Sequence, residues 1–164
     1  MITVEDVRKA AVRIAPYVRT TPLLTARCLK DDSFPDGELW LKLECLQVTG
    51  SFKARGVANK LLSLSGEAIR RGIVTASGGN HGLAVAYAGW LGKTTAWVFV
   101  PENISPEKAK KLQGWGAKVT ITGRHWHEAN QEALAFEERQ GLAYFHPFAD
   151  PAVIAGQGTI GMEI

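Results

Sequence analysis

The chain has 164 residues, of which 46 % are apolar and 21 % are charged, and its formal net charge is +3 at pH 7. These values are typical of a globular domain with its own core, and the scattering of Lys and Arg among Asp and Glu argues against a nucleic-acid-binding surface. No apolar run reaches the length of a membrane span, and the first residues lack the apolar core of a signal peptide. Cys28 and Cys45 share no metal-binding spacing. We therefore expect a cytoplasmic protein with reduced thiols that binds neither nucleic acid nor membrane.

The first part of the chain is predicted to contain two helices with extended segments between them. Thr3 can cap the first helix, whose apolar residues recur at helical spacing. Pro22 keeps Thr21 out of the helical region. The expected elements are, in order, a helix ending near Pro16, an extended segment at 20–23, a polar loop at 31–37, a strand at 38–44 and a helix from about 50 to about 65.

From Gly72 onward, strands and helices alternate. The expected elements are a strand at 73–76, a helix ending at Gly92, a strand at 94–100, a helix from Pro106 to Gln113, a strand at 118–122, a helix at 126–140 and a strand at 142–145. This alternation predicts a parallel sheet with right-handed helical crossovers. Four aromatic residues at core-like positions are interpreted as packing: Trp40, Trp90, Trp97 and Phe99. Residues 155–159 are interpreted as a loop that leads into a helix, with 160–164 as its first turn.

One lysine, Lys53, begins a predicted helix within the segment Thr49-Gly50-Ser51-Phe52-Lys53-Ala54-Arg55-Gly56. A solvated surface side chain is the commonest state of any lysine. Here apolar neighbours flank it, and the preceding strand is expected to direct the turn toward the carboxyl edge of the sheet, where open α/β sheets bind ligands. A lysine removed from water at such a place has a lowered pKa and is an amine nucleophile toward an aldehyde. Arg55 fits a salt bridge as well as a site.

The second notable segment, Ser77-Gly78-Gly79-Asn80-His81-Gly82, joins a predicted strand to a predicted helix. Such a turn exposes backbone amides at a helix N-terminus, which suits an anion, although a tight turn without a ligand is the alternative. The spacing matches neither Gly-x-x-x-x-Gly-Lys-Ser/Thr nor Gly-x-Gly-x-x-Gly, so a nucleotide phosphate loop fits poorly. Asn80 and His81 add more polar groups than a bare turn needs.

Together the two segments resemble the serine/threonine dehydratase and serine racemase family of fold-type II pyridoxal phosphate enzymes. Four further stretches are similar in the same order: Thr21-Pro22-Leu23, the strand at 38–44, Val100-Pro101 and Gly156-Gln157-Gly158-Thr159. The resemblance implies an α/β, three-layer fold with a parallel sheet, like that of the tryptophan synthase β-like enzymes. Residues 1–66 would begin a large cofactor domain, residues 67–148 would form a small doubly wound subdomain, and residues 149–164 would return to the large, truncated domain.

The resemblance also implies site residues. Lys53 would carry pyridoxal 5′-phosphate as an internal Schiff base and then act as an acid/base, Phe52 would pack beside the ring, and Asn80 would hydrogen-bond its phenolic oxygen. The donors to the carboxylate of a small amino-acid substrate, largely from the backbone, would be Ser77, Gly79 and His81. The implied reaction is that of a threonine/serine ammonia-lyase, which eliminates water from a hydroxy amino acid to give a 2-oxo acid and ammonia.

The sequence departs from the family pattern in two ways. Gly78 stands where the family's racemases have a serine, which favours elimination over racemisation. The family's glycine-rich phosphate loop would lie beyond residue 164, so we expect the isolated chain to be inactive. The resemblance also implies that the full-length protein is a homodimer. Alternatives are a non-catalytic binding module from a truncated or split gene, a serine racemase, or another fold-type II enzyme. No metal is expected, because His125 and His127 at a helix start are more often solvated.

Overall fold

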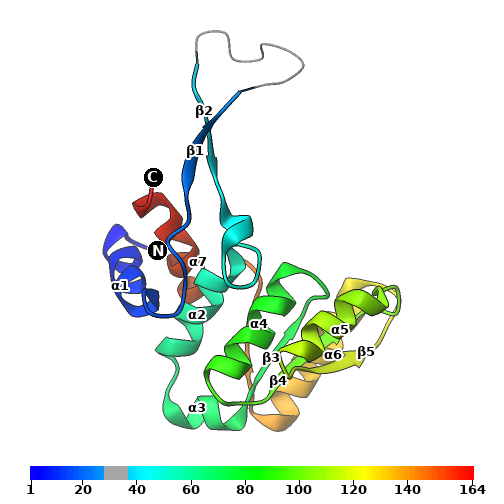
Figure 1. Ribbon diagram of the computed structural model, residues 1–164. Coiled ribbons are helices and arrows are strands. Elements are labelled where there is room, and N and C mark those ends of the chain that lie inside the picture. Colours follow the sequence, from blue (N-terminus) through cyan, green and yellow to red (C-terminus); the bar gives the residue numbers. More distant parts are fainter. Residues whose placement is uncertain (28–36) are drawn as a thin grey trace.

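The fold combines a four-stranded sheet, helices on both of its faces, and a separate hairpin that projects from the body (Figure 1). The computed structural model describes residues 1–27 and 37–164. Cys28 and nearly all of the loop expected at 31–37 therefore lie outside the described residues.

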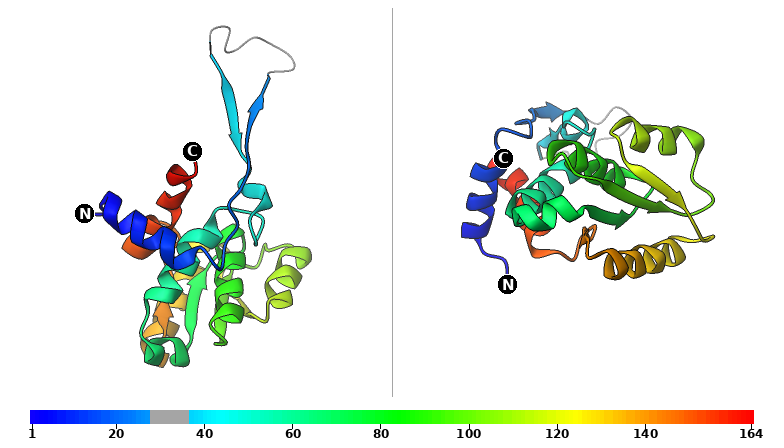
Figure 2. Two further views of the ribbon diagram at one scale, coloured as in Figure 1. Left: turned by 60° about the vertical axis from the view of Figure 1, so that its left-hand side comes forward. Right: turned by 90° about the horizontal axis from the view of Figure 1, so that it is seen from below.

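All neighbouring strands of the larger sheet are parallel, which confirms the predicted sheet type. Their order is β5-β4-β3-β6, and their bounds are β3 Ile73–Ala76, β4 Ala96–Val100, β5 Lys118–Ile121 and β6 Ala143–Tyr144. Helices α4 (Asn80–Leu91) and α5 (Pro106–Gly114) pack on one face, and α6 (Trp126–Gln140) packs on the other (Figure 2). The predicted doubly wound arrangement is thus confirmed.

The helices begin where their capping residues predict. Thr3 caps α1 (Val4–Ile14), because its side-chain oxygen accepts a hydrogen bond from the backbone N–H of Asp6 and the Asp6 carboxylate accepts one in return. Ser105 caps α5 by a single hydrogen bond, which its side-chain oxygen accepts from the backbone N–H of Lys108. Local side-chain chemistry therefore fixes these helix starts independently of tertiary packing.

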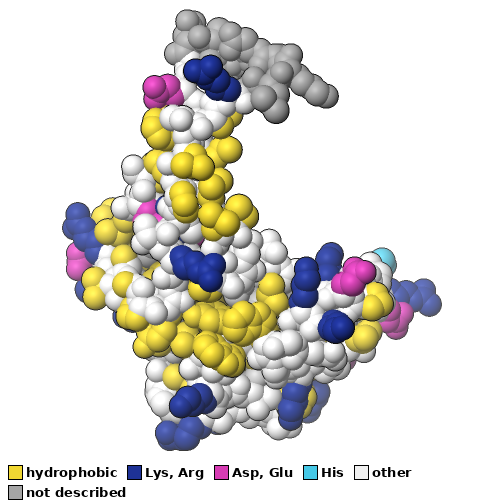
Figure 3. Space-filling model, in the orientation of Figure 1, with side chains coloured by type: hydrophobic (Ala, Val, Ile, Leu, Met, Phe, Trp, Pro, Cys, Tyr) yellow, Lys and Arg dark blue, Asp and Glu magenta, His cyan; other side chains and the backbone are white. Residues whose placement is uncertain are grey.

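The strand before Lys53, which was expected to direct the turn toward the carboxyl edge of the sheet, is not part of the parallel sheet. That strand, β2 (Leu39–Lys42), pairs antiparallel with β1 (Leu23–Ala26) in a separate two-stranded sheet. Trp40 on β2 is 48 % exposed, and Trp90 at the end of α4 is 61 % exposed. The prediction that these two residues occupy core positions is therefore wrong. Figure 3 shows apolar side chains along the hairpin and over the adjoining body.

Two further corrections concern helices. The structure contains a short helix, α3 (Gly66–Arg71), that the sequence analysis did not predict, although Ser65 caps it by accepting a hydrogen bond from the N–H of Ala68. Residues 155–159 do not form a loop, since α7 spans Pro151–Gly158 and the 3-10 helix η2 spans Thr159–Met162. Asp150 caps α7 with two hydrogen bonds, and Pro151 occupies its first turn.

Helix α2 (Lys53–Ser63) lies between α4 and α7, and it crosses α7 with backbone against backbone. A Cβ atom on Gly56 would lie 2.5 Å from the carbonyl oxygen of Val153. A Cβ atom on Gly156 would lie 2.6 Å from the carbonyl oxygen of Arg55. Both positions therefore require glycine, because backbone cannot yield as the end of a side chain does.

Replacing Gly156 by alanine should lower the free energy of unfolding by about 1–3 kcal/mol, because the added methyl group forces α7 away from α2. The matched control is Gly161→Ala in η2, where an added Cβ would meet no atom within 4 Å. Chemical denaturation monitored by circular dichroism measures both changes. Equal stabilities for the two variants would contradict the close crossing of α2 and α7.

Candidate active site

Lys53 is the first residue of α2 and is half-buried. Its Nζ donates a hydrogen bond of 2.7 Å to the carbonyl oxygen of Pro147, and it lies 5.0 Å from the centre of the Phe52 ring. Burial lowers the pKa of the Lys53 ammonium group below its ordinary value. The neutral amine is the form that attacks a carbonyl carbon, and this shift makes that form more accessible than in an exposed lysine.

The N-terminus of α4 forms the second part of the site. Ser77 Oγ accepts a hydrogen bond of 3.3 Å from the N–H of Gly79, the N-cap residue. The next N–H groups, those of Asn80, His81 and Gly82, belong to the first turn and have no carbonyl one turn back within the helix. A Cβ atom on Gly82 would lie 1.9 Å from the Ser77 carbonyl oxygen, so only glycine allows this tight entry. The turn therefore presents a set of amide donors.

His81 fixes the first turn of α4 from inside the protein. Its side chain is 3 % exposed, and its Nε2 lies 2.9 Å from the carbonyl oxygen of Phe145. Burial lowers the pKa of His81 to about 4, so the imidazole is neutral near pH 7. Since a carbonyl oxygen only accepts, Nε2 carries the proton and Nδ1, which has no hydrogen-bond partner among the described residues, carries the lone pair. His81 can offer only its backbone N–H outward.

The loop between β6 and α7 joins the two sequence motifs. Lys53 binds it at Pro147, and His81 binds it at Phe145. His146 Nδ1 accepts hydrogen bonds from the next backbone amides, 3.2 Å from the Phe148 N and 2.9 Å from the Ala149 N. Lys60 of α2 binds the Asp150 carboxylate at the end of the loop. The role of this loop was not predicted from the sequence, because its contacts to Lys53 and His81 are made by backbone carbonyl groups, which every residue has. Asp150-Pro151 does predict the start of the helix that follows.

A pocket of about 290 Å³ is lined by residues of both motifs, namely Thr49, Gly50, Gly78, Gly79 and Asn80. Lys108 and Lys111 of α5 also line it, together with two leucines, and were not predicted as site residues. The pocket is not lined by Phe52, Lys53, Ser77 or His81, although they belong to the same two sequence motifs.

Arg55 lies two residues after Lys53 and is 1 % exposed. Its guanidinium donates to both carboxylate oxygens of Glu44, at 2.9 and 2.8 Å, and to both of Glu163, at 2.6 and 2.9 Å. Lys42 Nζ donates to Glu163 at 2.6 Å, and the Thr21 hydroxyl donates to Glu44 at 2.5 Å. The charges balance, with two cations and two anions, so Arg55 is a salt-bridge residue, the alternative that the sequence left open.

These residues fit pyridoxal phosphate. An amine of lowered pKa lies beside an exposed aromatic ring, and amide donors at a helix N-terminus lie on an adjacent element. The buried hydroxyls of Thr49 and Ser51 have no hydrogen-bond partner among the described residues, which is typical of polar groups that meet a bound ligand.

Residues 1–27 and 37–164 contain neither a metal-binding cluster nor a membrane-spanning helix. No group of three or more His, Cys, Asp or Glu side chains is arranged to hold a metal ion there. Within the same ranges, every helix is too short or too polar to cross a bilayer.

Comparisons with known proteins point to the same cofactor. The family model described as "pyridoxal-phosphate dependent enzyme" matches residues 14–164. Over all 164 residues the chain is 43 % identical to the L-threonine ammonia-lyase of Thermotoga maritima and 38 % identical to the catabolic L-threonine dehydratase TdcB of Staphylococcus aureus. It covers 40 % and 47 % of these two proteins, so the chain spans less than half of their length.

Solved structures show the same relationship. Maize serine racemase superposes with a TM-score of 0.91 at 31 % identity over 99 % of this chain and 49 % of its own. Threonine deaminase isoform 2 of Solanum lycopersicum superposes with a TM-score of 0.86 at 34 % identity over 98 % of this chain and 45 % of its own. The fold is thus that of fold-type II enzymes, as predicted. The chain belongs to the family of pyridoxal-phosphate dependent enzymes.

Proposed function

We propose that this chain forms the reactive half of a threonine/serine dehydratase, which eliminates water from a β-hydroxy amino acid and releases a 2-oxo acid and ammonia. The observation that carries the proposal is that Lys53 and the first turn of α4 are held by the same loop, at Pro147 and Phe145. The identity to the L-threonine ammonia-lyase, which extends over the whole chain, supports this reaction type.

Three residues are proposed to hold the cofactor. Lys53 Nζ would bond to its aldehyde carbon, Phe52 would pack against its ring, and Asn80 would donate a hydrogen bond to its phenolic oxygen. When bound, pyridoxal phosphate supplies a ring that accepts the negative charge developing on the substrate α-carbon. The lowered pKa of Lys53 supports its role, because the neutral amine is the reactive form.

The substrate carboxylate is proposed to bind the amide donors of Ser77, Gly79 and His81. The existing hydrogen bonds support the use of backbone rather than side-chain donors. The His81 imidazole already donates to the carbonyl oxygen of Phe145, and the Ser77 hydroxyl oxygen already accepts from the N–H of Gly79. Lys53 Nζ would remove the α-proton of the substrate that these amides orient. The β-hydroxyl group would then leave as water, with Lys53 as the proton carrier on its side of the site. Hydrolysis of the resulting enamine would consume one water and give the 2-oxo acid and ammonia.

Gly78 supports elimination rather than racemisation. A racemase needs a second proton-carrying group on the opposite face of the substrate, and glycine has no side chain to provide one. A Cβ atom on Gly78 would lie 3.1 Å from Ile104 Cδ1, so the position is also crowded. Serine racemase remains the second candidate, because maize serine racemase shares the fold of this chain.

The remaining features of the full-length protein are also proposals. Residues 1–66, 67–148 and 149–164 would form the start of a large domain, a small domain and the return to the large domain. The phosphate group would bind a loop outside this chain. The protein would be a cytoplasmic homodimer, in line with the exposed apolar side chains on the hairpin, since most soluble oligomers are homodimers.

The proposal is tested with a chimera in which this chain replaces the matching 40 % of the T. maritima L-threonine ammonia-lyase. The chimera should form 2-oxobutanoate from L-threonine and the corresponding 2-oxo acid from L-serine, measured by coupled reduction of the product. The 164-residue chain alone should show neither activity nor a stable visible absorbance with the cofactor.

The control is the unmodified T. maritima protein, assayed in parallel, with circular dichroism to establish that the chimera is folded. A folded chimera that binds no cofactor would favour a non-catalytic binding module. Production of D-serine from L-serine at a rate above that of elimination would favour a racemase.

A further inference from the structure

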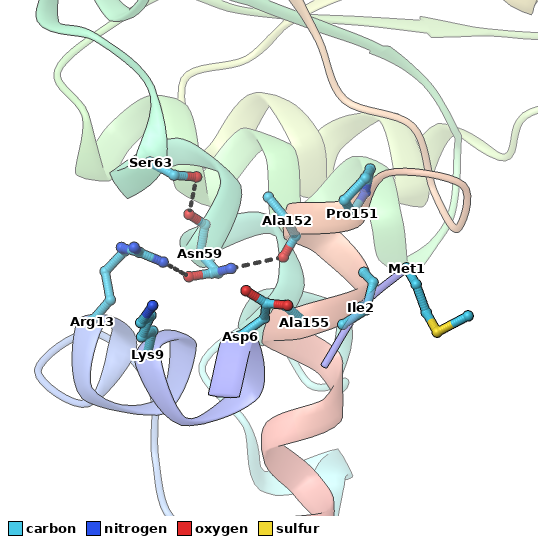
Figure 4. Close-up of a pocket in the computed structure, with 10 residues that line it drawn as sticks. All are labelled: Met1, Ile2, Asp6, Lys9, Arg13, Asn59, Ser63, Pro151, Ala152 and Ala155. Carbon is cyan, nitrogen blue, oxygen red and sulfur yellow. Dashed lines mark hydrogen bonds between the residues drawn. The ribbon is translucent and has the colours of Figure 1, made fainter. Parts of the chain in front are cut away.

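A second pocket lies away from the proposed active site, between α1, α2 and α7. Its volume is about 380 Å³, and Figure 4 shows the side chains that line it. Helix α1 contributes Asp6, Lys9 and Arg13, and α2 contributes Asn59 and Ser63. None of the residues assigned to the cofactor or to the substrate lines this pocket, so any ligand here would be distinct from both.

Two cations lie next to each other on the wall formed by α1. Lys9 and Arg13 are four residues apart and therefore lie on one side of the helix, where like charges repel. Among the described residues, neither has a carboxylate within 4.0 Å of its charged nitrogens. Hydrogen bonds that its Oδ2 accepts from the hydroxyl and the backbone N–H of Thr3, and then the charge of Lys9, lower the pKa of the nearby Asp6 carboxylate. The three charged side chains that α1 contributes to this wall therefore leave a net charge of +1.

Arg13 is held in place by a buried amide. Its Nη1 donates a hydrogen bond of 2.6 Å to Asn59 Oδ1, and Asn59 is only 2 % exposed. Asn59 Nδ2 in turn donates to the carbonyl oxygen of Ala152 at 2.8 Å, and the Ser63 hydroxyl donates to the Asn59 carbonyl. Figure 4 shows this chain of hydrogen bonds running from Arg13 through Asn59 to α7. The guanidinium is therefore pre-oriented, with only one of its donor groups used by Asn59.

We propose that this pocket binds a small oxyanion, that is, the carboxylate or phosphate group of a small organic molecule. A fixed guanidinium recognises two oxygens of such a group at once, and Lys9 adds a point charge. The apolar side chains of Ile2, Pro151 and Ala155 line the rest of the pocket and suit the carbon part of the ligand. The start of α7 is not the anion donor, because Asp150 already accepts from the N–H groups of Ala152 and Val153.

The test uses the 164-residue chain and two probes, inorganic phosphate and acetate, each titrated at constant ionic strength set with sodium chloride. The signals to follow by NMR are the side-chain amide resonances of Asn59, which should shift and saturate. Lys9→Gln removes a charge without disturbing the core, and Arg13→Lys keeps the charge but loses the planar fork. Each should weaken the apparent affinity about tenfold. Arg8→Gln, on the same helix but outside the pocket, should leave the affinity unchanged.

The outcomes separate the two ligand sources. Saturation by phosphate alone assigns the site to phosphate groups, saturation by acetate alone assigns it to carboxylates, and saturation by both assigns it to oxyanions in general. Shifts that do not saturate, or that persist equally in all three variants, would overturn the proposal. The NMR readout depends neither on the cofactor nor on catalysis. Its result therefore tests the anion site independently of the dehydratase assignment.

Discussion

Replacing Lys53 by alanine in the chimera should abolish a borohydride-stable link between the cofactor and the protein. It should also lower the rate of 2-oxobutanoate formation. The loss of general acid–base catalysis alone lowers a rate by about 10²–10⁴-fold, and the loss of cofactor attachment adds to this effect. The physical reason is that this amine is proposed both to attach the cofactor and to move the substrate α-proton. Peptide mass spectrometry after reduction locates the label, and steady-state kinetics measure the rate.

Two variants separate this role from other effects. Lys53→Arg keeps a cation near Pro147 but removes the nucleophilic amine, so it should be as inactive as Lys53→Ala. Lys110→Ala removes an exposed lysine from α5 and should keep both the label at Lys53 and the rate. Label that stays on another lysine with full activity in the Lys53 variants would refute the assignment of Lys53.

Replacing Arg55 by methionine should lower the free energy of unfolding at pH 7 by about 3–5 kcal/mol, the cost of breaking a buried ion pair by removing one partner. Without the guanidinium, the carboxylates of Glu44 and Glu163 are left facing each other with Lys42 as their only neutralising cation among the described residues. Chemical denaturation at pH 7 measures the change. Arg8→Met is the matched control, because its pair with Glu5 is exposed and should contribute less than about 1 kcal/mol.

The same network predicts how stability depends on acid. Burial raises the pKa of Glu163, but hydrogen bonds from Arg55 and Lys42 outweigh it and lower that pKa from 4.5 to about 2. The pKa of Glu44 is lowered in the same sense. A carboxylate whose pKa is lower when folded stabilises the protein above its unfolded pKa and loses this contribution as the pH falls. Stability should therefore decline from about pH 5 toward pH 2, and Arg55→Met should flatten this decline. An unchanged acid dependence in the variant would contradict the network.

Sequence patterns located best those elements whose signals are local. β3 and α6 have the predicted bounds, because a short apolar strand before a glycine turn and a polar-faced helix are recognised from neighbouring residues. The parallel sheet follows from the alternation of such elements. The motif around Lys53 and the turn at 77–82 were likewise found locally, and the structure places Lys53 at the start of α2 and Gly79 at the start of α4.

Features that depend on distant residues were not predictable in this way. The alternating pattern of β2 predicts a strand, but it does not predict which strand pairs with it. In the structure β2 pairs with β1 and not with the parallel sheet. Trp40 is exposed for the same reason, since a strand in a two-stranded hairpin has little to bury against. The Pro147 carbonyl that binds Lys53 lies 94 residues away from it, and backbone groups do not vary with sequence.

The position of Glu163 has a consequence for synthesis of the chain. Its bonds to Arg55 span 108 residues, those to Lys42 span 121, and that to Thr21 spans 142. A ribosome makes these partners long before it makes Glu163, so Arg55 cannot acquire its second carboxylate until nearly the whole segment has emerged. Contacts of such separation also form slowly, because the loop-closure entropy must be overcome first. The strands of the four-stranded sheet lie between residues 73 and 144, all before Glu163. This sheet can therefore fold before Arg55, and with it α2, acquires its final contacts.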